Sequence, residues 1–399
     1  MPDVAIVGGG IVGAACAYEL SRAGATVTLI ERDELAAGAS GRNQGWFVLP
    51  EDPVLEPMAR ATLPEYLEVA ASAALPVWID PEPVGHLLVA LESEDISRAQ
   101  HTLSSATAQG VAIKPLDPAE LREAEPAITP DAVAGWLLDQ GHRLDPAALT
   151  VALALAAKAA GADIRHHVRV RAFVYDGDAI RGVVTDDGPI HADTVILAAG
   201  PWSTSLLDPI GVHLAVTGAR GWIVRVRPTS GTLHHLIEHV GWRDAPERLA
   251  AVAQPSAGSV AKDGMPEAEV GAILHLHTDG TILVGSSRQP WITPEPEDPG
   301  VPQRQLRAAI RLVPSLAGAT VTSTWWGLRP ITPDERPLVG VVRDGLVVAT
   351  GHGSEGVILG AGTAKLVASI VLGGAPPFDA APFDPFRFDP WRGSSVRRP

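Results

Sequence analysis

Cysteine and tyrosine are scarce in this sequence, and acidic residues outnumber basic ones. The 399-residue chain has one cysteine and three tyrosines, with 31 basic residues, 46 acidic residues and a net charge of −15. A single thiol excludes an intrachain disulfide, a zinc site of several cysteines and an iron–sulfur cluster. The negative charge disfavours nucleic acid and anionic membranes as partners. We expect an acidic protein of the reducing cytoplasm.

Long apolar runs and targeting signals are also missing. The first apolar stretch has no basic segment ahead of it and is interrupted by glycines, so we expect no signal peptide. The richest later apolar run, residues 147–157, is too short to span a bilayer. The chain is longer than the roughly 100 to 200 residues of one typical domain. We therefore expect a globular protein with two domains and no membrane span.

The N-terminal residues have the pattern of a strand, a helix and a second strand. Residues 4–7 are a short apolar run, residues 14–23 have helical composition, and residues 26–31 return to a β-rich run. A glycine-rich turn, residues 8–13, separates the first strand from the helix. This order is that of a βαβ unit.

The spacing of glycines in that turn predicts dinucleotide binding. Gly8 allows a tight turn, Gly10 lets the backbone approach a pyrophosphate, and Gly13 lets the helix pack closely. Glu31 ends the second strand, where a carboxylate suits a ribose diol. The alternative is a glycine-rich packing turn without a ligand. The motif by itself leaves FAD and NAD equally open.

The middle of the chain has β-type alternation. Residues 84–91, 216–227 and 273–286 alternate as antiparallel strands do, with a hairpin turn at Asp279-Gly280. Residues 194–199 read as a further strand of the nucleotide-facing sheet. A second sheet, antiparallel and separate from the βαβ unit, is therefore expected.

Four further segments resemble the D-amino-acid oxidase, glycine oxidase and sarcosine oxidase family of flavoproteins. They are GASGRNQG at 38–45, VILAAGPW at 195–202, GLRPITPDERPLVG at 327–340 and GHGSEGVILGAG at 351–362. The resemblance covers nearly the whole chain. It implies the α/β class, with a Rossmann-like FAD-binding domain and a second α+β substrate domain built on an antiparallel sheet.

The resemblance also implies how the chain is divided and which residues hold the cofactor. The predicted FAD-binding domain comprises residues 1–83, 143–215 and 321–375, the substrate domain 84–142 and 216–320, and a surface tail 376–399. The predicted cofactor-binding residues are Gly8, Gly10, Ile11, Val12, Gly13, Glu31, Arg32, Ser40, Gly41, Arg42, Asn43, Gln44, Gly45, Val168, Ala199, Gly200, Trp202, Arg329, Gly351, His352, Gly353, Ser354, Glu355, Gly356 and Val357.

The glycine-led segment near the C-terminus favours FAD over NAD. Residues 351–356 open a predicted helix that continues to about residue 372, and the resemblance implies that its N-terminus faces the flavin pyrimidine ring. A helix N-terminus carries partial positive charge, which stabilises the negative charge of a reduced flavin. Cys16 lies in the first helix, and residues 40–45 contain no histidine. FAD is therefore expected to be held without a covalent link.

Arg329 aligns with the family arginine that binds the substrate carboxylate. A guanidinium stays charged and presents a planar fork that grips both carboxylate oxygens. The alternative for Arg329 is a structural ion pair. His352 is a candidate for proton transfer at the flavin, against a packing role.

The substrate pocket has few recognisable side chains in the sequence. None of the tyrosines falls on the expected pocket strands, so tryptophans are expected to shape the pocket: Trp222, Trp242, Trp325 and Trp326. The histidines of the expected second domain, His234, His235, His239, His275 and His277, lack carboxylate or cysteine at ligand spacing, so no metal site is expected.

The expected reaction is oxidation of the C–N bond of an amino acid or secondary amine, of the D-amino acid, glycine or N-alkyl glycine type. A hydride passes to flavin N5 and leaves an imine, and the electrons go on to oxygen or another acceptor. Two alternatives are a flavin hydroxylase or NAD(P)-linked flavoprotein reductase, and a non-catalytic FAD-binding protein. Substrate identity and oligomeric state are not fixed by the sequence.

Overall fold

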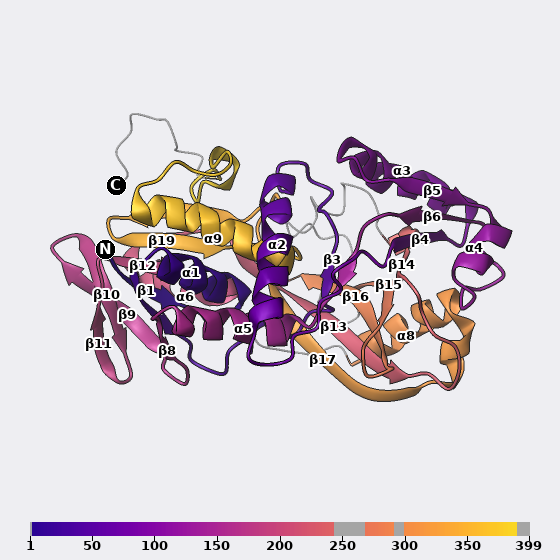
Figure 1. Cartoon of the computed structure of the whole chain (residues 1–399), viewed down its shortest axis with the longest axis horizontal. Helices are drawn as coiled ribbons and strands as arrows, with labels where there is room; N and C mark the ends of the chain where they lie inside the picture. The colour runs from indigo at the N-terminus through magenta and orange to yellow at the C-terminus, as the bar shows by residue number, and fades with distance from the viewer. Residues whose placement is uncertain (1, 243–267, 291–298, 389–399) are drawn as a thin grey trace.

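Two large sheets organise the residues that the structure describes, which are 2–242, 268–290 and 299–388 of this computed structural model (Figure 1). Neighbouring strands of the first sheet are parallel except for β18 with β19. Its strands in spatial order are β18 (Leu338–Arg343), β19 (Leu346–Thr350), β12 (Thr194–Leu197), β1 (Asp3–Val7), β2 (Thr26–Ile30) and β8 (Asp163–Arg165). Helix α1 (Ile11–Arg22) connects β1 to β2, so the predicted βαβ unit is confirmed.

Apolar layers cover both faces of this six-stranded sheet. Helices α1, α5 (Pro146–Ala159) and α9 (Gly356–Leu372) pack together over one face (Figure 1). A three-stranded antiparallel sheet of β9 (Val170–Asp176), β10 (Ala179–Thr185) and β11 (Gly188–His191) lies against the other. Strands β1, β12 and β19 are almost continuously apolar because side chains on both of their faces are buried.

The second large sheet has eight strands and forms the other half of the molecule. In spatial order they are β17 (Thr320–Ile331), β13 (Thr217–Arg227), β16 (Ile282–Pro290), β15 (Glu269–Leu276), β14 (Leu236–His239), β4 (His86–Ala90), β6 (Ala134–Leu138) and β5 (Ile113–Leu116). The predicted hairpin turn is confirmed, because Asp279 and Gly280 connect β15 to its antiparallel neighbour β16.

This sheet is antiparallel, as expected, except at one pair. Strand β4 runs parallel to β14 and antiparallel to β6. Alternation along a strand reports which face each side chain points to, but carries no information about the direction of the neighbouring strand. All five residues of β4 are buried, because β4 lies inside the sheet with apolar cores on both faces.

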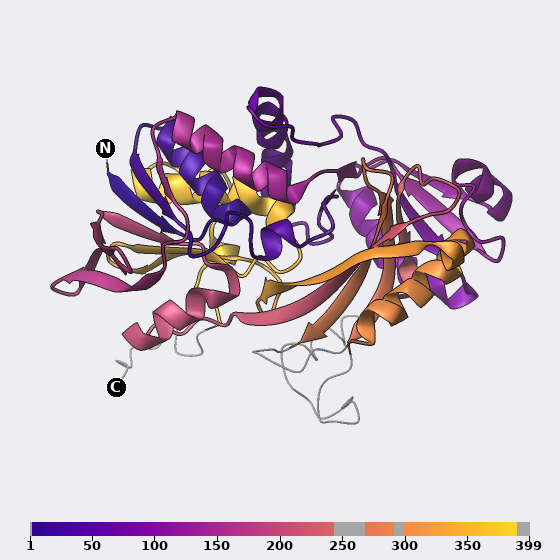
Figure 2. The same cartoon turned by 90° about the horizontal axis from the view of Figure 1, so that it is seen from below.

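Helices on opposite faces position the eight-stranded sheet. Helix α8 (Val301–Leu312) packs along β13, β15 and β16, as Figure 2 shows from below. Helix α3 (Ser93–Ala108) covers β4 and β6 from the other side. The shorter α4 (Pro118–Ala124) lies beside β5 and β6, and α6 (Ser203–Leu207) follows β12. The face of β13, β15 and β16 turned away from α8 is left for the cavity described below.

Helix α2 (Glu56–Ser72) stands between the two halves and packs against α9 (Figure 1). Tyr66, which is fully buried, donates a hydrogen bond of 2.8 Å from its hydroxyl to the carbonyl oxygen of Val357 in the first turn of α9. Burial raises the pKa of Tyr66, so the hydroxyl stays protonated as the donor. This contact ties α2 to the start of α9.

We expect Tyr66→Phe to lower the free energy of unfolding by about 1 kcal/mol, because it deletes one buried hydrogen bond and keeps the ring. Urea denaturation at a fixed FAD concentration measures the change. Tyr175→Phe is the matched control, since Tyr175 is 46% exposed and loses the same hydroxyl. Equal effects of the two substitutions would contradict the role given to the buried bond.

The described residues bear on three further expectations. No helix among them is long and apolar enough to cross a membrane. In the expected surface tail, residues 376–388 include the buried Phe383, which belongs to the core beneath α9, and residues 389–399 lie outside the described part. Strand β17 pairs with β13 although the predicted FAD-binding domain includes residues 321–375. The division of the chain into two domains stays a proposal.

Candidate active site

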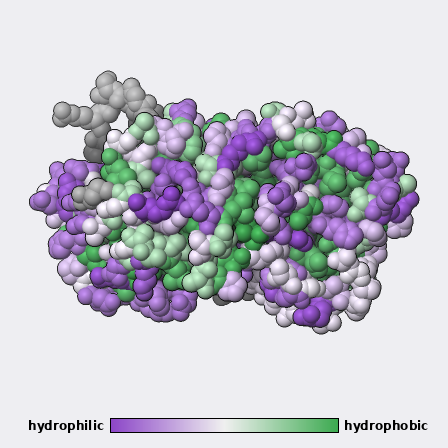
Figure 3. All heavy atoms as spheres, in the orientation of Figure 1, coloured by the Kyte–Doolittle hydropathy of each residue, from purple (hydrophilic) through white to green (hydrophobic). Residues whose placement is uncertain are grey.

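One cavity of about 1820 Å³ runs from the carboxyl ends of β1, β2 and β12 to the open face of the eight-stranded sheet. Ligand sites of open α/β sheets lie at this edge of the strands. The volume exceeds the roughly 300 to 1,000 Å³ of a typical small-molecule pocket, so a dinucleotide and a second ligand fit together. Apolar residues gather along the middle of the molecule, between its two halves (Figure 3).

The glycine turn brings the N-terminus of α1 to the cavity wall. Gly8 has φ of +116°, and a Cβ there would lie 2.5 Å from the carbonyl oxygen of Ala198 on the adjacent chain segment. A Cβ on Gly13 would overlap the carbonyl oxygen of Gly8. The amide of Ile11 donates to Ser40 Oγ at 2.8 Å, which links the helix start to the 38–45 segment. These close approaches leave no room for side chains and make a cradle for a phosphate group.

Glu31 is held at the end of β2 by two backbone amides. Its carboxylate accepts hydrogen bonds from Gly9 N at 2.7 Å and from Asp33 N at 2.8 Å. The amide of Val168 donates to the Glu31 carbonyl oxygen, which brings the strand region before β9 alongside. The Arg32 guanidinium lies 4.2 Å from the ring centre of Trp202. These residues form one end of the cavity.

Residues 38–45 bridge the two sheets. Arg42 donates from Nε to the carbonyl oxygen of Ala37 and from Nη1 to that of Trp326 on β17. Gln44 donates from Nε2 to the carbonyl oxygen of Ile273 on β15 at 2.8 Å. The segment therefore forms a shared wall of the cavity rather than a free surface loop.

The N-terminus of α9 forms the wall at the other end. Gly353 N donates to the carbonyl oxygen of Pro330 at 2.7 Å, so the helix start is joined to β17. His352 is 3% exposed and its Nε2 lies 3.0 Å from Thr363 Oγ1. Burial lowers the pKa of His352 to about 3, so the ring is neutral near pH 7. This environment favours the packing role over proton transfer.

Arg329 reaches the cavity by crossing a neighbouring strand. Its side chain leaves β17, passes over Gly221 of β13 and donates from Nη1 to the carbonyl oxygen of Ser287 on β16 at 2.9 Å. A Cβ at position 221 would overlap the guanidinium. Burial, together with the positive charge of Arg288, lowers the pKa of Arg329 to about 10. Arg329 therefore remains charged at neutral pH and faces the ligand space.

Nearly all predicted cofactor-binding residues line this cavity, but Gly13, Gly41 and Gly351 do not. These three glycines accommodate backbone contacts instead. The amide of Gly41 donates to the carbonyl oxygen of Ala36, and Gly351 has φ of +77°, where a Cβ would lie 2.6 Å from Thr332 Cγ2 and 3.5 Å from the amide nitrogen of Leu338. These three glycines shape the cavity wall, and we expect no direct contact between them and the ligand.

The tryptophans follow the sequence expectation only in part. Trp326 is a lining residue, although its side chain packs with its cross-strand partner Trp222, whereas Trp222 and Trp325 are not lining residues. Gly221 and Ile223 of β13 face the cavity, so alternation turns Trp222 to the opposite side, where it is 8% exposed. Trp325 donates from Nε1 to the carbonyl oxygen of Arg42. The side chain of Trp242 lies outside the described residues.

The five histidines of the second sheet have separate partners. His234 and His235 lie beside Glu125, His239 beside Asp95, His275 beside Trp46 and His277 beside Asp279. Within the described ranges, one group of three possible metal ligands has its ligand atoms within 4.8 Å of one another: the exposed Glu34, His166 and His167. Sequence reasoning did not find this group, because Glu34 is distant in the chain from the two histidines.

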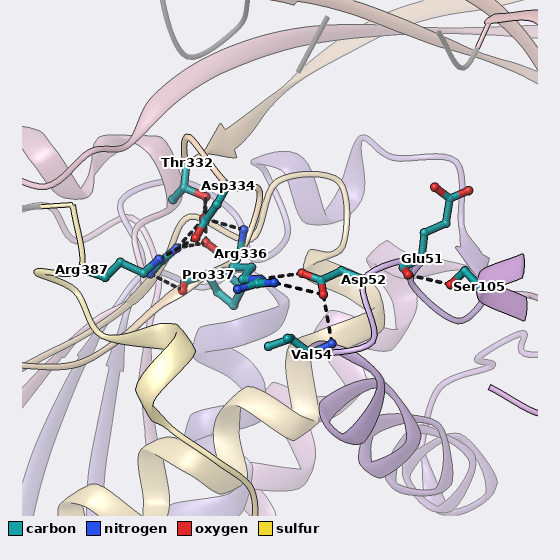
Figure 4. A network of polar contacts seen from close by, with 9 residues as sticks. All are labelled: Glu51, Asp52, Val54, Ser105, Thr332, Asp334, Arg336, Pro337 and Arg387. Carbon is teal, nitrogen blue, oxygen red and sulfur yellow. Dashed lines mark hydrogen bonds and ion pairs between the residues drawn. The ribbon is translucent and has the colours of Figure 1, made fainter. Parts of the chain in front are cut away.

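The loop of residues 332–337 forms part of the cavity wall and is fixed by two arginines (Figure 4). Arg336 donates to both carboxylate oxygens of Asp52, at 2.6 and 3.3 Å, in the segment after β3 (Trp46–Phe47). Arg387 of the C-terminal segment donates to both oxygens of Asp334. The loop is therefore held from both sides beside Arg329.

A family model described as FAD dependent oxidoreductase matches residues 3–370. The chain belongs to this family. The chain is also 29% identical to glycine oxidase from Pseudomonas aeruginosa, with 95% of this chain and 97% of that one covered. It is 30% identical to 4-methylaminobutanoate oxidase (formaldehyde-forming) from Paenarthrobacter nicotinovorans, covering 94% of this chain. It spans about half the length of some curated relatives, including 44% of the latter.

Solved structures of the FAD-dependent oxidoreductase family agree with the fold. The crystal structure of glycine oxidase from Geobacillus kaustophilus superposes with a TM-score of 0.82 at 26% identity, over 97% of this chain and 98% of that one. The predicted α/β fold class and the FAD-dependent family are thereby confirmed. The cradle at α1 and the acid at Glu31 fit FAD as the cofactor of this chain.

Proposed function

We propose that this protein oxidises the C–N bond of an amino acid or secondary amine, with FAD bound noncovalently in the cavity. The observation that carries the proposal is the charged Arg329 in the same cavity wall as the N-terminus of α9. One suits a substrate carboxylate and the other suits a reduced flavin. The names of the relatives, glycine oxidase and 4-methylaminobutanoate oxidase, support an amine substrate.

The residues present fit FAD in one direction along the cavity. The end with Glu31 and Val168 would hold the adenosine half, the α1 N-terminus the pyrophosphate, and the α9 N-terminus the flavin ring. Cys16 is buried in α1 and does not line the cavity, which supports noncovalent binding. When bound, FAD supplies the acceptor for a hydride from the carbon bearing the amine, and water hydrolyses the resulting imine.

The chain itself binds and orients the substrate. Arg329 would hold the carboxylate with the donors not used by Ser287, fixing the C–H bond toward the cofactor. Ile223 lies in the same wall and would limit water near the reacting carbon. A neutral substrate amine needs no protein base, in agreement with the neutral His352.

Anaerobic mixing with candidate amines tests this function. We expect at least one of glycine, sarcosine, D-alanine, L-proline or 4-methylaminobutanoate to bleach the yellow absorbance of the bound flavin. Readmitting air then identifies the electron acceptor of the reduced flavin. Rapid return of the yellow colour with release of hydrogen peroxide indicates oxygen, and slow return indicates another acceptor. Purified protein that carries FAD but is bleached by no amine would contradict the proposal. A cytoplasmic location stays a prediction from composition.

A further inference from the structure

Arg288 places a second guanidinium in the cavity beside Arg329. It belongs to β16, directly after Ser287, whose carbonyl oxygen accepts the Arg329 hydrogen bond. The Arg288 side chain is 15% exposed and lines the cavity. The positive charge of Arg288 contributes to the lowered pKa of Arg329, so the two groups are close enough to repel each other. Glu335 and Glu355, which also line the cavity, act on the pKa of Arg329 in the opposite direction.

A carboxylate of the protein lies against Arg288. Glu335 accepts a charge-assisted hydrogen bond from Arg288 Nη1, while Arg288 Nη2 is 3.4 Å from Ser354 Oγ. Glu335 has φ of +59°, a left-handed conformation that is unfavourable for a non-glycine residue. The loop that holds it is fixed by Arg336 and Arg387 (Figure 4). The turn of residues 332–335 therefore presents this carboxylate to Arg288.

We propose that the substrate carries a second carboxylate, which Arg288 binds in place of Glu335 while Arg329 binds the first. This inference rests on the proposed amine oxidation and names its substrate class, a dicarboxylic amine or amino acid. Glu335 would mimic the second carboxylate in the absence of substrate. Its side chain is 35% exposed, so it has solvent to move into when the substrate displaces it.

The arrangement differs from a purely structural ion pair. Arg288, Glu335 and Ser354 all line the cavity, and β16, the 332–337 loop and the α9 N-terminus meet there. Arg336 and Arg387 already fix the loop from outside, so Arg288 is not needed for that purpose. A guanidinium with five donors can exchange one carboxylate for another at little cost in hydrogen bonds.

Two matched substrate pairs test the proposal on the FAD-loaded enzyme. Sarcosine and iminodiacetate differ by one carboxylate, as do alanine and aspartate of the same configuration. We expect the dicarboxylic member to have the higher kcat/KM in at least one pair. Arg288→Gln should lower kcat/KM for the dicarboxylic member by about 10- to 100-fold more than for the monocarboxylic member, the loss of one charge-assisted hydrogen bond.

Glu335→Gln is expected to have the opposite effect, which is tighter binding of the second carboxylate. It keeps the side-chain shape and removes the competing charge, so KM for the dicarboxylic member should fall. Binding without turnover is measured by titrating the FAD-loaded enzyme with succinate or with butyrate and following the flavin absorbance spectrum. Succinate should bind more tightly to the wild type, and Arg288→Gln should remove that preference. FAD content and thermal unfolding show whether each variant is folded.

The outcomes separate this inference from the function on which it rests. Bleaching by monocarboxylic amines with no preference for either dicarboxylate, in activity or in binding, overturns the second-carboxylate assignment alone. An equal loss for both members of a pair in Arg288→Gln also overturns it, because that result indicates a structural role. If no amine of either kind bleaches the flavin, the proposed function and this inference fail together.

Discussion

We expect Arg329→Ala to lower kcat/KM for carboxylate-bearing amines by about 10²- to 10³-fold. Loss of one partner of a buried charge pair costs about 3 to 4 kcal/mol, which corresponds to this range. The guanidinium lies in the cavity wall with Nη1 bonded to the carbonyl oxygen of Ser287, and its other donors would bind the substrate carboxylate. Without it, the substrate carboxylate would be desolvated and unpaired. Steady-state kinetics with the best substrate of the bleaching panel measure the loss.

Two controls isolate the carboxylate contact. An amine that lacks a carboxylate should react with the variant and the wild type at rates within about threefold, because it never used Arg329. Gly221→Ala keeps the arginine but places a Cβ against its guanidinium, so it should reproduce part of the defect by displacement. Arg329→Ala with normal FAD content and undiminished activity on carboxylate substrates would show that the substrate assignment is incorrect.

The predicted parts of the site are those that depend on local spacing. Gly8, Gly10 and Gly13 act on the turn and helix within which they occur, so their pattern identifies the βαβ unit from sequence alone. The same holds for residues 351–356, which start α9. In each case a short run of glycines has one physical function, which is close approach of backbone at a helix start.

The parts that escaped prediction depend on pairing between distant strands. Arg288 meets Arg329 because β13 lies between β16 and β17, and because Gly221 leaves space for a side chain to cross. Neither the strand order nor the register between β13 and β16, which shifts after Arg220, is encoded in a local motif. The residue type of Trp222 predicts a place in the pocket, whereas its position beside Gly221 on the strand turns it away. Alternation becomes informative only once one cavity-facing neighbour is known.

The glycines of the first turn are also expected to determine how tightly FAD binds. A methyl group at position 13 would overlap the Gly8 carbonyl oxygen, a backbone atom fixed between β1 and the 198–199 segment. Helix α1 would have to move away from β1, and its N-terminal amides would lose their alignment with the pyrophosphate. We expect Gly13→Ala to weaken FAD binding by about 10- to 10³-fold, the loss of one or two hydrogen bonds to a charged group.

The FAD to protein ratio after purification, and titration of the apoprotein with FAD, measure this effect. Gly374→Ala is the matched control, since a Cβ there meets only an ordinary contact at 3.9 Å beyond the end of α9. Far-UV circular dichroism of the apoproteins separates lost affinity from lost folding, because the six-stranded sheet persists if only α1 shifts. A Gly13→Ala protein with wild-type folding and wild-type FAD affinity would mean that the α1 N-terminus does not hold the pyrophosphate. The orientation proposed for FAD along the cavity would then have to be abandoned.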